Sequence, residues 1–160
     1  MTDVRIRPAA PGDEGLVLDL IRSLADYERL SHEVEATEAE IAASLFGLNP
    51  RVFCDIVEWR GEVAGFALWF YNYSTFLGRH GLYLEDLFVR PQYRAHGLGK
   101  ALLVNLAQRC VRENLGRLEW SVLDWNEPAI GFYKKLGAVM RDEWTGCRIT
   151  GEALARLAGE

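Results

Sequence analysis

The residues LYLEDLFVRPQYRAHGLGK, at positions 82–100, decide how the rest of this chain is read. Their first part, Leu82–Val89, is an apolar run typical of a strand, yet it carries two acids. An Arg-x-x-Gly-x-Gly turn from Arg94 to Gly99 follows and opens a helix. Glycines let a backbone approach a ligand closely, and the free N–H groups of a first helical turn attract an anion. The stretch predicts a phosphate or pyrophosphate site beside an acid-bearing strand; the alternative is an ordinary tight turn.

Two better-known phosphate motifs do not fit this turn. A P-loop would need glycine at position 94 and serine or threonine at position 101, where the chain has Arg94 and Ala101. A dinucleotide fingerprint would need a third glycine at position 102, which is Leu102. The turn is therefore interpreted through its neighbours, Arg94 and the upstream acids, and not through its glycines alone.

Glu85 and Asp86 are the two acids of the strand. Adjacent residues on a regular strand point to opposite faces, so on a central strand at least one of them would leave bulk water. A buried carboxylate is costly unless it is paired. One interpretation is a salt bridge to Arg79 or Arg94. The other makes one acid a general base or a clamp for an ammonium group.

Composition limits the class of protein. The chain has 160 residues, a net charge of −5 and 49% hydrophobic residues, which predicts one globular domain over residues 1–160. The acidic balance argues against a nucleic-acid-binding surface. Three scattered cysteines fit neither a disulfide scaffold nor a zinc site, and no apolar run could span a membrane or act as a signal core. We expect a cytoplasmic protein with no membrane and no nucleic-acid partner.

Strand and helix patterns are mixed along the chain. Thr37 followed by Glu40 is a capping-box signal, and Asn126 before Pro128 begins another helix. The order predicts an α/β protein, a mixed sheet with helices on both faces. The expected elements are a strand at 4–7, a helix capped by Asp13, a helix at 37–46, strands at 52–59, 63–73 and 82–89, a helix at 98–113, a strand at 118–123, a helix after Asn126, and a hairpin of 138–141 with 145–149 before a short amphipathic tail.

Other side chains carry weaker signals. Tyr133 lies one step round its helix from the apolar pair Phe132 and Leu136, so it is either a packed residue or a phenol able to give up a proton. The histidines have no metal-ligand spacing, and we expect no metal site. His96 lies inside the glycine turn, where it could touch a phosphate or simply face solvent.

Taken together, these residues match a known family. The chain resembles the GCN5-related N-acetyltransferases, and within them the diamine acetyltransferase group of spermidine/spermine and thialysine enzymes. The resemblance covers nearly the whole chain. Its markers are Ile6–Ala9, Tyr27-Glu28, Tyr83–Asp86, the turn from Arg94 to Gly99, Asp124–Asn126 and Phe132–Lys134.

The resemblance implies acetyl-CoA as the donor and a set of roles for individual residues. Glu85 would deprotonate the incoming ammonium, Tyr133 would protonate the departing thiolate, and the N–H of Phe88 would stabilise the oxyanion. Tyr27 and Glu28 would bind the amine, together with the acids Glu85 and Asp86. The implied cofactor-binding residues are Leu87, Phe88 and Val89 for the pantetheine arm, Arg94, Ala95, His96, Gly97, Leu98, Gly99 and Lys100 for the pyrophosphate, and Asn126 near the thiol.

The resemblance also implies a homodimer and direct acetyl transfer to a primary amine of a small molecule. Residues 73–79 lack the Asp and Trp common in polyamine-specific members, and this favours a thialysine or lysine-like amine over spermidine and spermine. Ala95 replaces a common glycine, which is tolerable if the position does not need a positive φ. The alternatives are a protein or peptide acceptor, a non-catalytic acyl-CoA sensor, and a preference for a longer acyl chain.

Overall fold

The structure is a computed structural model that describes residues 2–160. The chain divides into two compact units, one ending at Leu123 and the other beginning at Asp124, and each is described by itself. The prediction of one domain over the whole chain stays a prediction. The first unit contains β1 (Val4–Pro8), α1 (Glu14–Tyr27), a 3-10 turn η1 (Ser31–Glu33), α2 (Glu38–Phe46), β2 (Phe53–Trp59), β3 (Glu62–Ser74), β4 (Arg79–Val89), η2 (Pro91–Tyr93), α3 (Leu98–Arg112) and β5 (Leu118–Trp120).

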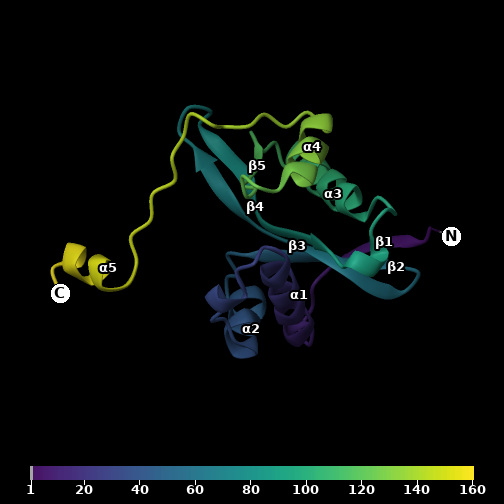
Figure 1. The fold of residues 1–160 in the computed structure, drawn as a ribbon, viewed down its shortest axis with the longest axis horizontal. Helices are drawn as coiled ribbons and strands as arrows, with labels where there is room; N and C mark the ends of the chain where they lie inside the picture. Colours follow the sequence, from purple (N-terminus) through teal and green to yellow (C-terminus); the bar gives the residue numbers. More distant parts are fainter. Residues whose placement is uncertain (1) are drawn as a thin grey trace. The chain divides into compact units, whose positions relative to one another are not determined.

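The strands of the first unit form a mixed sheet in the order β1-β2-β3-β4-β5. The first four are antiparallel neighbours, and β5 alone runs parallel, beside the start of β4. Helices α1 and α2 cover one face of this sheet, and α3 covers the other (Figure 1). The predicted mixed α/β fold with helices on both faces is confirmed.

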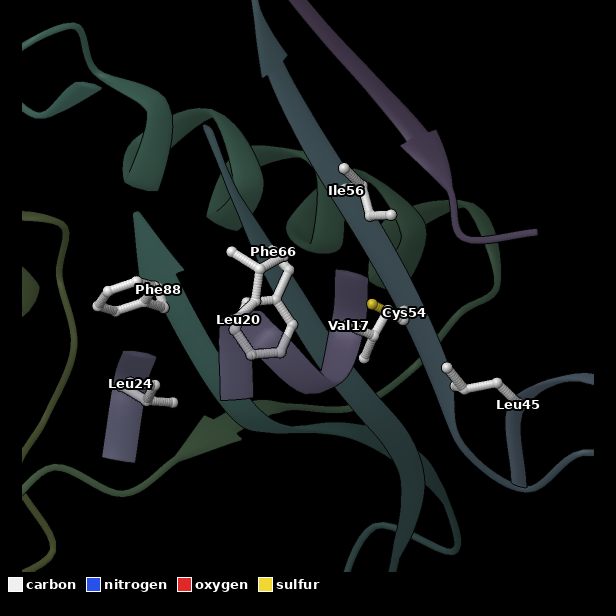
Figure 2. Packing of buried hydrophobic residues seen from close by; sticks show 8 residues of the cluster. All are labelled: Val17, Leu20, Leu24, Leu45, Cys54, Ile56, Phe66 and Phe88. Atoms are coloured by element: carbon white, nitrogen blue, oxygen red, sulfur yellow. The ribbon is translucent and has the colours of Figure 1, made fainter. Parts of the chain in front are cut away.

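The core on the α1 face is a cluster of apolar side chains from α1 and the central strands. Figure 2 shows Leu20 and Leu24 of α1 lying near Phe66 of β3 and Phe88 of β4. Leu20 and Phe66 are wholly buried, and burying a side chain of this kind contributes roughly 1.5–3 kcal/mol. This packing fixes the end of β4, where the site residues lie, against α1.

Local signals placed several element ends correctly. The Thr37 hydroxyl accepts a hydrogen bond from the N–H of Glu40, whose carboxylate accepts one from the N–H of Thr37, so the capping box is formed. The side-chain oxygen of Asn126 likewise accepts from the N–H of Ala129. Asn114 adopts a left-handed φ of 55° just after α3, as expected for a helix C-terminus.

Asp13 was predicted to cap α1, but its side chain forms no capping hydrogen bond, so this prediction is wrong. Asp13 occupies the N-cap position, but its carboxylate accepts hydrogen bonds from Arg7, at 2.7 Å, and from the backbone N–H of Ala10. A hydrogen bond between a carboxylate and a guanidinium is stronger than one between a carboxylate and a neutral helix N–H. The Asp13 carboxylate therefore pairs with Arg7 and does not cap the helix.

Two strand predictions also need correction. β4 begins at Arg79, three residues before the predicted start, and β5 ends at Trp120 instead of Leu123. The predicted hairpin of 138–141 with 145–149 is wrong, because the structure has no strand in residues 138–149. Val139 and Trp144 are 78% and 71% exposed there, and a two-stranded ribbon with no packed face is marginally stable in water.

The second unit contains α4 (Glu127–Lys135) and α5 (Gly151–Ala158). Gly137, with a φ of 98°, follows α4 as predicted, and α5 occupies the expected amphipathic tail. In the part of the chain from residue 2 onward, no helix combines the length and the apolar character needed to cross a membrane.

Candidate active site

The acids of β4 lie at an irregularity in the sheet. Leu84 pairs with Trp69 and Asp86 pairs with Leu68, so Glu85 is an extra residue between them, a β-bulge. The bulge interrupts the strict alternation that the sequence argument assumed. At this irregularity Glu85 is exposed and Asp86 is half-buried. Bulges commonly redirect a side chain next to an active site.

Asp86 is the acid whose protonation the fold changes most at this site. Burial, and then the charges of Glu85 and Glu28, raise its pKa to about 7. Glu28 lies at the C-terminal end of α1, and burial raises its pKa as well. The ends of α1 and β4 thus bring carboxylates close enough to repel one another. A cation bound between them would reduce this repulsion.

The salt-bridge interpretation of these acids is wrong for both arginines that it named. Arg79 donates to the side-chain oxygen of Asn114 at 2.9 Å. The Nε of Arg94 donates to the backbone carbonyl of Val89 at 3.0 Å. The acids are therefore left without either predicted partner, which favours the interpretation in which they hold a substrate ammonium.

Arg94 instead fastens the turn to two elements. Its guanidinium lies 5.0 Å from the ring centroid of Tyr27 and 5.7 Å from that of Phe88. Cation–π contacts of this kind join the end of α1, the end of β4 and the start of the turn. The structure thus brings together Tyr27, Phe88 and Arg94, residues that sequence reasoning had placed in one site for different reasons.

The backbone of the turn takes up two left-handed residues before α3 begins. Ala95 has a φ of 69° and Gly97 a φ of 72°. Glycine adopts this conformation readily, whereas for alanine it costs roughly 1–2 kcal/mol. Alanine was expected to be tolerable at position 95 only if φ is not positive there. Since φ is positive, Ala95 is held in a strained conformation.

The turn leaves room for a ligand next to its N–H groups. A Cβ built on Gly97 would meet no atom within 4 Å, and one on Gly99 would reach only a methyl of Val89 at 4.0 Å. α3 begins at Leu98, so the N–H groups of its first turn have no partner within the helix. Leu98 is buried and fixes the helix, while Lys100 is exposed. These features fit an anionic group such as the pyrophosphate of acetyl-CoA.

The end of β4 is also open along one edge. β5 pairs with β4 only at Leu82, Tyr83 and Leu84. Beyond Leu84, β4 keeps β3 as its partner, and within residues 2–160 no strand lies against its other edge. The backbone of Leu87, Phe88 and Val89 can therefore receive an extended ligand as an added strand does.

Asn126 and Tyr133 belong to the second unit. Asn126 is 8% exposed and uses its side-chain oxygen to cap α4. The Tyr133 ring lies 5.6 Å from that of Phe132, centroid to centroid. Their roles toward the thiol and the leaving group stay predictions.

Sequence reasoning missed a third contact to the turn. The indole ring of Trp59, at the end of β2, stacks on the imidazole of His96 with centroids 4.3 Å apart and planes 10° apart. The residues are distant in sequence and neither motif nor spacing signals the pair. His96 thus has an aromatic partner, in addition to any contact with a ligand.

The open strand edge and the glycine turn fit a protein that binds an acyl-CoA. The chain belongs to the acetyltransferase (GNAT) family, whose model matches residues 17–138. It is an N-acetyltransferase that uses acetyl-CoA as co-substrate.

The chain is similar over most of its length to acetyltransferases that act on small amines. The thialysine N-epsilon-acetyltransferase of Mus musculus is 39% identical over 99% of both chains. The L-ornithine N5-acetyltransferase of Arabidopsis thaliana is 36% identical and covers 96% of this chain and 87% of its own. Among solved structures, an integron cassette protein from the mobile metagenome of V. cholerae aligns over all of both chains with a TM-score of 0.77 and 28% identity.

Proposed function

We propose that the protein transfers an acetyl group from acetyl-CoA to the terminal primary amine of a small, amino-acid-like molecule such as thialysine, lysine or ornithine. The observation that carries this proposal is the set of carboxylates Glu28, Glu85 and Asp86 beside the open end of β4. The full-length similarity to thialysine and ornithine acetyltransferases supports the acceptor class.

Bound acetyl-CoA supplies an activated thioester, and the residues of this chain arrange the attack on it. Such an amine is mostly protonated at neutral pH and must lose a proton before it can act as a nucleophile. Glu28 and Asp86 hold the ammonium group, and the exposed Glu85 accepts its proton through water. The N–H of Phe88 donates to the developing oxyanion, and the Tyr133 hydroxyl protonates the departing thiolate.

The backbone of Leu87–Val89 and of the turn from Arg94 to Lys100 would hold the pantetheine arm and the pyrophosphate, and Asn126 would contact the cofactor at its thiol end. No metal takes part in this scheme. Transfer is direct, without a covalent enzyme intermediate, since no side chain is placed as a nucleophile for one.

We further propose that the enzyme is a homodimer, and that it works in the cytoplasm, as its odd number of scattered cysteines indicates. In the single chain, the second unit exposes large apolar side chains to water. Ile149, Leu154 and Leu157 are 51%, 53% and 72% exposed. The resemblance implies a homodimer, and we propose that the second copy covers this surface.

The proton-accepting role of Glu85 is tested by Glu85→Gln. The variant should lose kcat/KM at pH 7 by one to two orders of magnitude, within the roughly 10²–10⁴-fold that general bases contribute. The loss should shrink as the pH approaches 10, where the free amine becomes abundant and needs no base. The matched control is Glu62→Gln, an exposed acid at the start of β3. A constant deficit across this pH range would remove Glu85 as the base.

A further inference from the structure

The contact between Trp59 and His96 joins the proposed phosphate turn to the opposite half of the sheet. Trp59 is the last residue of β2 and is half-buried, while His96 is exposed in the turn. Their rings stack nearly parallel, with centroids 4.3 Å apart. The Arg60 guanidinium lies 5.1 Å from the Trp59 ring centroid.

The turn needs such a contact because its backbone is strained at Ala95, the residue next to His96. Ala95 and Gly97 both have left-handed φ angles, 69° and 72°. A non-glycine residue stays in this region only when its surroundings hold it there. Arg94 supplies one fastening, its bond to the Val89 carbonyl, and buried Leu98 supplies another at the helix start. Between these two points, His96 is the residue whose side chain is large enough to pack against another element.

Trp59 is itself firmly placed. It pairs with Val4 of β1 and with Glu62 of β3. The backbone N–H of the following residue, Arg60, donates to the Asp3 carbonyl at 2.7 Å. The backbone that carries the indole is therefore held by both neighbouring strands.

We infer that Trp59 is a positioning residue for acetyl-CoA: by stacking on His96 it keeps the turn from Arg94 to Gly97 in the conformation that presents its N–H groups to the pyrophosphate. This inference rests on the proposed role of the turn in cofactor binding. It assigns part of the affinity for CoA to a residue of β2, outside the turn. Trp59 takes no part in the chemical step, so it should affect binding and leave kcat nearly unchanged.

The test is a double-mutant cycle on the full-length protein, read as the Kd for CoA by calorimetry. Trp59→Leu keeps an apolar side chain on β2 but removes the indole, and it should raise the Kd about five- to tenfold while kcat changes less than twofold. Trp59→Phe keeps a ring and should restore most of the affinity. His96→Ala should weaken binding at least as much as Trp59→Leu, and adding Trp59→Leu to it should have no further effect.

A second readout does not depend on CoA. The ring current of Trp59 should shift the His96 Cε1 proton upfield in the NMR spectrum of the ligand-free protein, and Trp59→Leu should return it to an ordinary position. Unchanged Kd in Trp59→Leu, or losses that multiply in the double variant, would overturn the inference. A wild-type protein that shows the shifted proton but binds no CoA would contradict the proposed role of the turn and, with it, the positioning role of Trp59.

Discussion

At the scale of single residues, Asp86 is the acid of the site whose ionised form the fold disfavours. Burial and the nearby Glu85 and Glu28 raise its pKa to about 7, against 3.8 for an ordinary aspartate. The folded state therefore keeps a proton that the unfolded chain has already lost between about pH 4 and pH 7. By linkage, this group makes the folded state less stable as the pH rises through that window.

Asp86→Asn should remove this dependence. Relative to wild type, the variant should gain stability between pH 5 and pH 8, by at most about 4 kcal/mol, because each unit of pKa corresponds to about 1.4 kcal/mol. The measurement is the free energy of unfolding in urea at a series of pH values. Asp142→Asn, at an exposed position, serves as control. Parallel pH profiles for wild type and Asp86→Asn would contradict the raised pKa.

The residues of the site could be predicted from the sequence only as far as local motifs reach. The glycine turn was found from Arg94 and its two glycines, and the acids from their place in an apolar run. Their final geometry depends on events that no short stretch encodes. The bulge at Glu85 arises from the pairing of β4 with β3, and the stacking of Trp59 on His96 joins distant segments.

At the scale of elements, the junction of β3 and β4 carries the site. Gly65 of β3 lies so close to β4 that a Cβ there would clash with the Phe88 carbonyl oxygen and would lie 3.0 Å from the Val89 Cα. Both neighbours are backbone atoms, which cannot move without separating the strands. Close approach of two backbones is a common reason for glycine within a strand.

Gly65→Ala should therefore destabilise the protein by at least about 1–3 kcal/mol and also weaken CoA binding, because Phe88 and Val89 are displaced. Thermal unfolding and CoA titration together measure both effects. Gly131→Ala is the matched control: this helical glycine has open space around it, and alanine should gain roughly 0.5–1 kcal/mol. Wild-type stability in Gly65→Ala would mean that the strands are farther apart than the structure has them.

Element ends were predictable where a side chain forms a hydrogen bond with a nearby backbone group, as with Thr37 and Glu40 or with Asn126. They were not predictable where tertiary contacts decide. Asp13 has the right identity for a cap, but Arg7 recruits its carboxylate. The segment around Val139 and Ile149 has β-branched residues at suitable spacing, yet among residues 2–160 it pairs with no strand.

At the scale of the whole molecule, the exposed apolar side chains of the second unit lead to a prediction about assembly. Leu154 and Leu157 lie on α5 and are more than half exposed. If a second copy covers them, the protein should run at twice the 18.1 kDa of one chain in light scattering after gel filtration. Leu157→Glu should shift it toward the monomer. Val111→Glu, at an exposed apolar position of α3, should not. A wild-type monomer with full activity would contradict the homodimer.

The most direct test of the central claim is release of free thiol from acetyl-CoA in the presence of thialysine, lysine, ornithine, putrescine, spermidine or spermine. The site and the relatives predict turnover with the amino-acid-like amines, and less with the polyamines, for which residues 73–79 lack an additional acid. Efficient turnover of spermidine and spermine would show that this acid is dispensable. No thiol release with any of the six amines, while the protein still binds CoA, would contradict a small-molecule acceptor and leave a peptide acceptor or an acyl-CoA sensor.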